Sequence, residues 1–163
     1  MATETVHDFR EPYYEIINGE KFLRHGDNFK HNTINNNLIM LIGTYVAKNR
    51  LGFIFFNLKT QLPDGNQFYP DFMIVDRTQE RLVIDNKHKP FCGVPDMAVE
   101  IFSRSTMRND IGIKKDVYER NGVKEYWMID PWRESVTVYL LRDGKYELDE
   151  IYLSRRKTPT LGI

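Results

Sequence analysis

The sequence predicts a protein of the α/β or α+β class, with a mixed central β-sheet, helices packed on its faces and an N-terminal β-hairpin. Two segments, residues 29–48 and 107–120, have the apolar spacing of helices, and short β-prone runs lie between and after them. One such run, residues 97–102, stands directly before the second helical segment, and another, residues 124–129, follows it. Strands and helices in this order favour a sheet covered by helices.

The length and composition are typical of one ordered domain. The chain has 163 residues, of which 41% are hydrophobic and 13% aromatic, with 10 Gly and 7 Pro. A chain of this size can build a single sizeable core but not two. We therefore expect one domain over residues 1–163.

The first elements are a hairpin and a long helix. The segment YYEIINGEKFLR alternates around Asn18-Gly19, which is a strong signal for a two-residue hairpin turn. The helix is expected from Phe29 to Lys48, and Gly52 stands just past its end as a stop. The apolar positions that predict this helix are Ile34, Leu38, Leu41, Ile42 and Tyr45.

The middle of the chain reads as strands and turns. Residues 53–58 and 69–75 are β-prone, the second run is entered through Pro70, and residues 63–66 form a turn between them. Residues 76–94 are polar and indicate a loop, with a short strand at Leu82–Ile84. Residues 97–102 are apolar except for Glu100, as expected of a central strand covered on both faces.

The last part of the chain contributes a helix and three strands. Residues 103–106 offer N-caps for the helix at 107–120, and Asn121-Gly122 ends it. Residues 124–129, 135–141 and 145–153 read as strands, the last two joined at Asp143-Gly144. If the strands on either side of the helix are parallel, they form a right-handed crossover.

The charge balance excludes a protein that coats nucleic acid by bulk attraction, because 23 basic residues match 23 acidic ones. The charges are uneven, however: residues 1–20 are acidic and residues 104–124 are rich in Lys and Arg. No apolar stretch approaches the roughly 20 residues that span a bilayer, and the N-terminus lacks a signal-peptide core. We therefore expect a cytoplasmic protein. Cys92 is the only cysteine, so an internal disulfide and a thiolate zinc cluster are excluded.

Asp71, Glu100 and Lys114 form an ordered acid, acid, base series. Two converging carboxylates can hold a hard divalent cation, and a nearby ammonium can orient a water molecule. Each residue also has an ordinary explanation. Asp71 follows Pro70 at a strand entrance, where aspartate often serves a turn, and Lys114 lies four residues after Asp110, as in a helical ion pair.

Glu100 is the most informative of the three, because an acid inside the apolar run 97–102 loses its solvation and needs a cation. That cation is a metal or a basic side chain, and both alternatives stay open. Asp96 is expected to end the Val94-Pro95 turn. Glu15 is expected to be solvated beside the hairpin turn, and His31 to be a helix cap or a surface residue.

The longer strings YPDFMIV and GVPDMAVEIFSRSTMRNDIGIKKDVYERNGVKEYWMIDP give a more specific indication. The chain resembles the putative restriction endonuclease family, a group within the PD-(D/E)XK nuclease superfamily, over about residues 11–142. The resemblance implies a restriction-endonuclease-like αβββαβ core. It also covers the segment YEIINGE and the pair His31-x-x-Ile34 at the start of the first long helix.

The resemblance assigns roles residue by residue. Asp71 is similar to the acid of the family's PD motif and Glu100 to the acid of its second motif. Phe102 occupies the usual acid-x-lysine position, so the lysine corresponds to Lys114 on the following helix. Glu15 is a possible additional acid. The chain departs from the family at Arg104, where the family usually has proline.

The activity that the resemblance implies is Mg²⁺- or Mn²⁺-dependent endonucleolytic hydrolysis of DNA. Asp71, Glu100 and the backbone carbonyl of Ile101 would bind the metal, and Lys114 would position or deprotonate the attacking water. The expected phosphate-binding residues are Arg104, Arg108 and Lys115. The alternative is a catalytically inactive nuclease-fold module that binds nucleic acid or protein, and a third, weaker reading is a hydrolase of a small phosphoester.

A homodimer is also expected, because nucleases that cut both strands often act as two-fold pairs. Its candidate interface lies in the C-terminal strands, with the aromatic residues Trp127, Trp132 and Tyr139, although Trp127 suits the core better.

Overall fold

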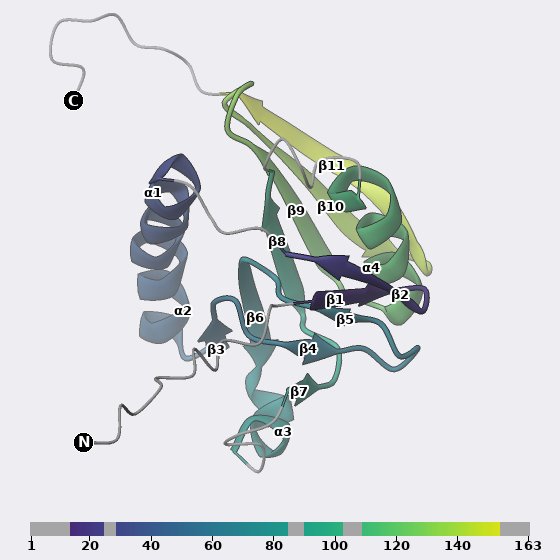
Figure 1. Ribbon diagram of the computed structural model, residues 1–163. Coiled ribbons are helices and arrows are strands. Elements are labelled where there is room, and N and C mark those ends of the chain that lie inside the picture. The colour runs from purple at the N-terminus through teal and green to yellow at the C-terminus, as the bar shows by residue number, and fades with distance from the viewer. Residues whose placement is uncertain (1–13, 25–28, 85–89, 103–108, 154–163) are drawn as a thin grey trace, which may run out of the picture.

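The computed structural model describes residues 14–24, 29–84, 90–102 and 109–153, which form two β-sheets and the helices around them (Figure 1). A six-stranded sheet has the order β11-β10-β9-β8-β6-β3, and a five-stranded sheet has the order β2-β1-β5-β4-β7. Both sheets contain parallel and antiparallel neighbours. The predicted α/β or α+β class is therefore confirmed.

The large sheet consists of β3 (Gly52–Phe55), β6 (Phe72–Asp76), β8 (Met97–Ile101), β9 (Glu125–Asp130), β10 (Ser135–Arg142) and β11 (Lys145–Leu153). The small sheet consists of β1 (Tyr14–Ile17), β2 (Glu20–Leu23), β4 (Thr60–Gln61), β5 (Gln67–Phe68) and β7 (Phe91–Cys92). The helices are α1 (Phe29–Leu38), α2 (Thr44–Asn49), α3 (Glu80–Ile84) and α4 (Lys115–Asn121). A π-helical turn at Ile39–Gly43 joins α1 to α2, another at Asn109–Lys114 leads into α4, and a 3₁₀ turn at Arg77–Gln79 precedes α3.

The αβββαβ core is present in chain order. The α1–α2 helix is followed by β3, β6 and β8, then by α4 and β9. Strands β8 and β9 are parallel, with Ala98 opposite Tyr126 and Glu100 opposite Met128, whereas β6 runs antiparallel to β8. The small sheet is built from the N-terminal hairpin and from segments between β3 and β8.

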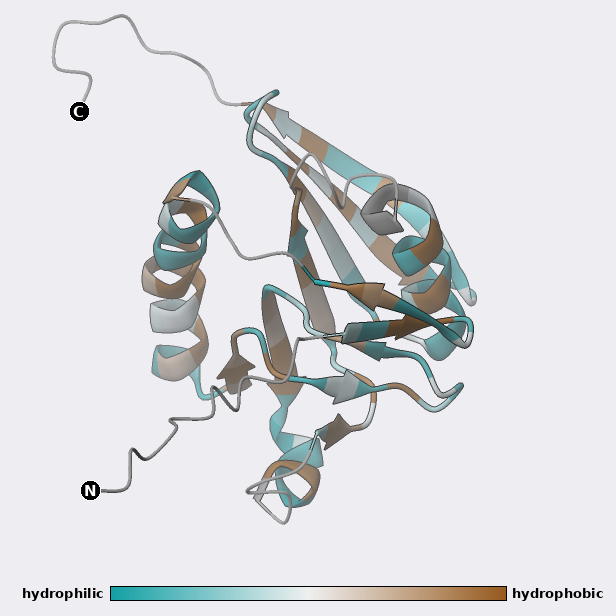
Figure 2. Ribbon diagram, viewed as in Figure 1, coloured by the Kyte–Doolittle hydropathy of each residue, from teal (hydrophilic) through white to brown (hydrophobic). Residues whose placement is uncertain are grey.

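The large sheet separates two apolar layers (Figure 1). On one face, the α1–α2 helix packs Ile34, Leu38 and Ile42 against Phe72, Val99, Ile101 and Ile129. On the other face, α4 and the small sheet contribute Val117, Tyr118, Ile17 and Phe68 to a second core around Ala98 and Phe102. Figure 2 shows β3, β6 and β8 as largely hydrophobic strands, as expected for strands between the two layers.

Both predicted hairpin turns are present. Asn18 and Gly19 have φ angles of 51° and 86°, and Asp143 and Gly144 have φ angles of 49° and 78°. Left-handed backbone at both central residues is the geometry of a type I′ turn, which matches the twist of the flanking strands. The two-residue signals therefore placed β1–β2 and β10–β11 correctly.

The segment after β6 corrects a prediction, because Leu82–Ile84 belongs to helix α3 and not to a strand. Asp76 caps this segment: its side chain accepts a hydrogen bond of 2.8 Å from the N–H of Thr78. Gln79 stands three residues after Asp76, which is the spacing of a capping box. The signal for the start of this helix lay in the polar residues Asp76 and Gln79. The short apolar run Leu82–Ile84 alone is compatible with a helix or a strand.

The end of the first helix also differs from the prediction. The helix stops at Arg50, which takes the left-handed conformation with φ 54°, and Gly52 opens β3. Gly52 serves a close approach instead, because a β-carbon there would lie 2.2 Å from the carbonyl oxygen of Val75 on β6. A larger residue at this position would push the two strands apart.

The inward face of this helix differs from the predicted one as well. Leu41 and Tyr45 were expected to face the core, but they are exposed. The cause is the π-helical turn at Ile39–Gly43, which has more residues per turn than an α-helix and so rotates the positions that follow. Ile42 and Val46 turn inward, and Leu41 and Tyr45 turn outward.

Candidate active site

Asp71 stands one residue before β6, next to the backbone of β8. In the antiparallel pairing of these strands Phe72 lies opposite Val99, so one further step of the register pairs Asp71 with Glu100. Oδ2 of Asp71 accepts a 2.7 Å hydrogen bond from the N–H of Ile101, and Asp71 is only 4% exposed. The strand register therefore brings the first acid to the part of β8 that carries the second.

Glu100 is a buried acid on the face of β8 that packs against α4. It is 3% exposed, and its neighbours on the same face, Ala98 and Phe102, belong to the apolar core. Oε1 accepts a 2.8 Å hydrogen bond from the hydroxyl of Tyr118, and Oε2 lies 3.3 Å from Nζ of Lys114. Both carboxylate oxygens thus face a donor on the following helix.

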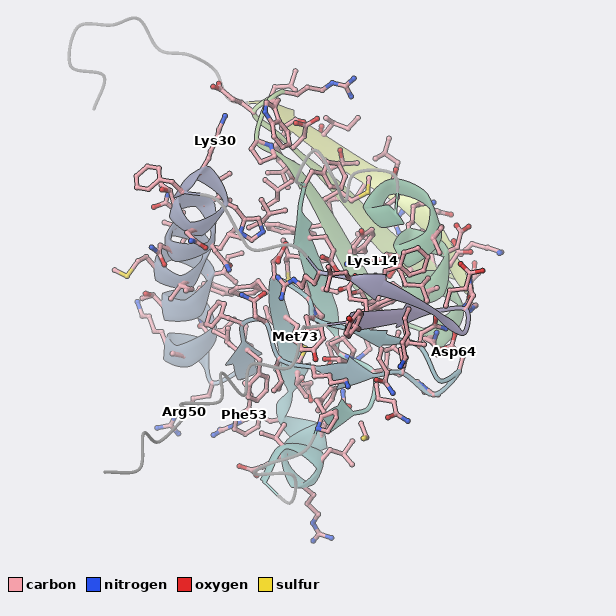
Figure 3. The ribbon with its side chains drawn as sticks, in the orientation of Figure 1. Lys30, Arg50, Phe53, Asp64, Met73 and Lys114 are labelled. Carbon is pink, nitrogen blue, oxygen red and sulfur yellow. The ribbon has the colours of Figure 1, made fainter. Side chains whose placement is uncertain are left out.

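Lys114 joins the two sheets. It ends the π-helical segment before α4, is 3% exposed, and lies where the large sheet meets the small one (Figure 3). Its Nζ donates a 2.9 Å hydrogen bond to Oε1 of Glu15 on β1 and lies 5.4 Å from the ring centroid of Phe68. Oε1 of Glu15 also accepts a hydrogen bond of 3.2 Å from the N–H of Tyr69.

The structure therefore brings Glu15, Glu100 and Lys114 into direct contact, and places Asp71 beside them through Ile101. Glu15 is buried, not solvated as its place beside the hairpin turn suggested, because the small sheet turns it toward Lys114. The ion pair predicted between Lys114 and Asp110 cannot be compared, since the side chain of Asp110 lies outside the described residues.

Three further residues belong to this cluster. His31 is 5% exposed and places Nε2 3.0 Å from Oδ2 of Asp71, so the expectation of a helix cap or surface residue is wrong. A guanidinium nitrogen of Arg24 lies 2.9 Å from Oδ1 of Asp71. The third residue is Tyr118, which holds Glu100.

Two of these three carried a signal in the sequence. His31 precedes Ile34 by three residues and Leu38 by seven, so the apolar stripe of α1, extended by one turn, includes it. Tyr118 follows Lys114 by four residues and therefore shares its helix face. Arg24 follows the hairpin, and nothing in the surrounding pattern indicates its partner.

Of the predicted phosphate-binding residues, only Lys115 lies among the described residues, and its role stays a prediction. The ammonium of Lys115 lies 4.7 Å from the ring centroid of Tyr139, away from the contacts of Lys114. Arg104 and Arg108 are outside the described residues. Asp96 was expected to end the Val94-Pro95 turn; in the structure its carboxylate accepts hydrogen bonds from the N–H of Asp76 and from Lys124.

The surroundings of Tyr118 keep it protonated. Burial, and then the negative charge of Glu100, raise the pKa of Tyr118 well above its ordinary value. The phenol therefore remains a hydrogen-bond donor to Glu100 throughout the neutral range. The rings of Phe68 and Tyr126 pack against it at centroid distances of 5.2 Å and 5.1 Å.

The donor atoms suit a hard divalent cation that keeps much of its own hydration. Two carboxylates and a nearby main-chain carbonyl are oxygen ligands, which Mg²⁺ prefers, and Mg²⁺ usually takes only one or two carboxylates from a protein. Among the described residues, no three or more Asp, Glu, His or Cys side chains gather as a metal-binding group. The set therefore fits a cation completed by water and phosphate oxygens, and does not fit a closed structural site.

Comparison with known proteins identifies a family and a solved structure of similar fold. The family model Uma2, described as "Putative restriction endonuclease", matches residues 3–162. A crystal structure of a putative nuclease belonging to DUF820 from Anabaena variabilis ATCC 29413 superposes with a TM-score of 0.72 at 21% identity, covering 91% of this chain and 82% of that one. No curated protein matches significantly. Within the described residues, no helix has the length and hydropathy to cross a membrane.

Proposed function

Since this chain belongs to the Uma2 family, described as "Putative restriction endonuclease", we propose that it is a divalent-metal-dependent endonuclease that hydrolyses phosphodiester bonds in DNA. The observation that carries the proposal is the contact of buried Glu100 with Lys114, beside an Asp71 whose carboxylate reaches the same strand. Buried acids next to a buried amine are costly for stability, so their gathering in one place favours a catalytic role.

Asp71, Glu100 and the carbonyl of Ile101 would hold Mg²⁺ or Mn²⁺. When bound, such an ion supplies a Lewis acid that lowers the pKa of a water ligand and offsets the charge that develops on the phosphate. The N–H of Ile101 fixes one oxygen of Asp71 at 2.7 Å, so the orientation of this ligand is set by the strand itself. Tyr118 fixes Glu100 in the same way from α4.

Lys114 would orient the attacking water and steady the charge on the phosphate. Its ammonium is held between Glu15 and Glu100, at 2.9 Å and 3.3 Å, so it cannot swing away into solvent. Glu15 is thus a positioning residue for Lys114. A preorganised cation of this kind stabilises the transition state without reorganising during the reaction.

The proposed reaction is hydrolysis of a phosphodiester bond. The water oxygen forms a bond to phosphorus while the bond between phosphorus and the 3′ oxygen breaks, in line with the attack. One water proton passes to the solvent, and the departing 3′ oxygen takes a proton. The products carry a 5′ phosphate and a 3′ hydroxyl.

The chain has no net charge, so DNA would be held by local cations. We propose Arg104, Arg108 and Lys115 for this contact with phosphates, as positioning residues that read no bases. Action in the cytoplasm as a homodimer, with one site for each strand, completes the proposal.

The test is DNA cleavage by the purified protein with Mg²⁺ or Mn²⁺ on supercoiled, linear and single-stranded DNA. Asp71→Asn and Glu100→Gln should each lower the rate by ~10²-fold or more, because each removes charge that acts on the transition state. Asp64→Asn is the matched control, since Asp64 pairs with Arg120 away from these residues. A wild-type protein that cuts none of these substrates with either metal overturns the proposal.

The alternative, a nuclease-fold module that binds without cutting, is favoured by one observation. Arg24 pairs with Asp71 and Lys114 pairs with Glu100, so the acids have counter-ions within the protein. Calorimetry with Mn²⁺ separates the two functions. The nuclease takes up Mn²⁺ at a site that Asp71→Ala removes, whereas the binding module takes up none there.

A further inference from the structure

The outer face of the α1–α2 helix is apolar and exposed. Met40 is 70% exposed, Leu41 is 73% exposed and Tyr45 is 62% exposed. The hydroxyl of Thr44, between them on the same face, donates to the carbonyl of Met40, so this residue presents its methyl group. We call Met40, Leu41, Thr44 and Tyr45 the outer patch. In Figure 1 the α1–α2 helix forms the outermost layer on its side of the large sheet.

The π-helical turn creates this patch. Regular α-helical spacing would place Leu41 and Tyr45 on the inward face with Ile34 and Leu38, and the turn at Ile39–Gly43 rotates them outward. π-helical turns are rare and occur frequently at functional sites. The chain therefore uses an uncommon backbone conformation to expose side chains that could have been buried.

The helix carries no charged residue between Lys30 near its start and the exposed Lys48 in its last turn. Residues 31–47 contain no Asp, Glu, Lys or Arg, although charged residues make up 28% of the chain. Exposed Asn36 and Asn37 border the outer patch on its N-terminal side. An apolar centre bordered by uncharged polar groups, with charged residues depleted, is the composition of a protein interface.

The charges identify what covers the patch. Nucleic acid is a poor occupant, because Lys and Arg supply most of the attraction for phosphates and residues 31–47 contain neither. The N-terminal residues are a poor cover for an apolar patch, since they carry the charges of Glu4, Asp8 and Glu11. An uncharged surface, by contrast, can meet its own copy across a two-fold axis without like charges opposing each other.

We propose that the outer patch is the two-fold interface between two copies of this chain. The inference specifies the homodimer suggested above and rests on that part of the proposed function. It replaces the interface expected in the C-terminal strands. Tyr139 packs against the core, and Trp127 is partly buried against the other apolar layer.

Strand β11 is the competing surface, because it is a long edge strand with Leu148, Ile151 and Tyr152 exposed. Its exposed carboxylates argue against pairing with a copy of itself. Glu147, Asp149 and Glu150 lie close together, and Arg142 of β10 pairs with the first two. Antiparallel pairing of two β11 strands would therefore bring six carboxylates together with only two of these guanidinium groups. Charged residues on an edge strand are a common protection against such pairing.

The experiment measures mass in solution by size exclusion with light scattering, without DNA or metal. The wild type should elute at twice the 19.4 kDa of one chain. The double variant Leu41→Glu/Tyr45→Glu should elute at the mass of one chain, with an unchanged circular dichroism spectrum because both residues are exposed. The matched control Ile151→Glu/Tyr152→Glu places the same charges on β11 and should remain a dimer.

A charge exchange tests the two-fold symmetry. Leu41→Lys/Tyr45→Lys should also be monomeric, and an equimolar mixture with the Glu variant should recover the dimer mass. Any one of four results overturns the proposed interface. These are a wild type that is monomeric at ~10⁻⁴ M, a Glu variant that stays dimeric, a β11 control that becomes monomeric, and a mixture of the Glu and Lys variants that stays monomeric. None of these mass measurements depends on the cleavage assay. The proposed interface and the proposed nuclease activity are therefore tested separately.

Discussion

The ammonium of Lys114 donates a 2.9 Å hydrogen bond to Oε1 of Glu15, a residue 99 positions earlier in the chain. Glu15 belongs to β1 of the small sheet, whereas Lys114 leads into α4 on the large sheet. The same ammonium lies 3.3 Å from Glu100 on β8. One cation therefore holds together two carboxylates from different layers of the protein.

Replacing Lys114 by methionine should destabilise the protein by about 3–5 kcal/mol, because it leaves Glu15 and Glu100 buried without their cation. Urea unfolding measures the loss. Lys115→Met, whose ammonium rests on the ring of Tyr139, should change stability by about 1 kcal/mol or less. Equal stabilities for the two variants would show that the buried pairs contribute nothing. A loss of cleavage in Lys114→Met has to be read against its stability.

Replacing His31 by asparagine should weaken Mn²⁺ binding or cleavage by about 10–100-fold, the usual effect of losing a residue that orients a metal ligand. His31 Nε2 lies 3.0 Å from Oδ2 of Asp71, so the variant removes one of the groups that hold this carboxylate, while Ile101 and Arg24 remain. Calorimetry with Mn²⁺ gives the dissociation constant apart from activity. Thr33→Ala, an exposed position on the same helix, serves as control. An unchanged dissociation constant in His31→Asn would reduce His31 to a packing residue.

Tyr118→Phe should cost about 1–3 kcal/mol, because one oxygen of the buried Glu100 loses its donor. The variant should also change the alkaline limb of the stability curve. The pKa of Tyr118 is raised in the folded state, so above its ordinary value of 10.0 the unfolded chain releases a proton that the folded one keeps. The contribution of the Tyr118 hydroxyl to the free energy of unfolding is therefore fully present below pH 10.0 and decreases as the pH rises above that value. Thermal unfolding between neutral and alkaline pH should show a shallower decline for Tyr118→Phe than for the wild type.

Gly52→Ala should destabilise the protein by about 3 kcal/mol, since its β-carbon would lie 2.2 Å from the carbonyl oxygen of Val75 and force β3 away from β6. Gly112→Ala is the matched control, because nothing lies within 4 Å of the added carbon and the position is helical. This control should be neutral or stabilising by up to about 1 kcal/mol. If both variants unfold at the same denaturant concentration, the close approach at Gly52 does not constrain the sheet.

Much of the fold could be predicted because its signals are local. Asn18-Gly19 and Asp143-Gly144 encode their turns in two residues, and the apolar run at Met97–Ile101 needs no partner to be recognised as a buried strand. Helix α3 was missed for a related reason. Its apolar residues are too few to show a period, so only the cap at Asp76 distinguishes it from a strand.

The outward rotation of Leu41 could not be predicted from spacing. A periodicity argument assumes 3.6 residues per turn throughout, and the π-helical turn at Ile39–Gly43 breaks that assumption without any glycine or proline signal before it. The prediction of the helix was sound, whereas the prediction of its inward face held for Ile34, Leu38 and Ile42 but not for Leu41 and Tyr45.

In the candidate site, too, residues within continuous motifs could be predicted from the sequence, whereas a contact between distant segments could not. The order of Asp71, Glu100 and Lys114 could be recognised from motif strings, since those strings are continuous. The partner Arg24 could not, because Arg24 and Asp71 are 47 residues apart and meet only in the folded protein. Sequence spacing carries no record of such a contact.

The small sheet supplies Glu15, and the large sheet supplies Glu100, to one ammonium. If the small sheet detached, even with the rest of the molecule intact, Lys114 would lose the group that holds it in place. A partly opened molecule would therefore lack the complete arrangement of Glu15, Lys114 and Glu100, and under the proposed function cleavage would require the two sheets to be docked against each other.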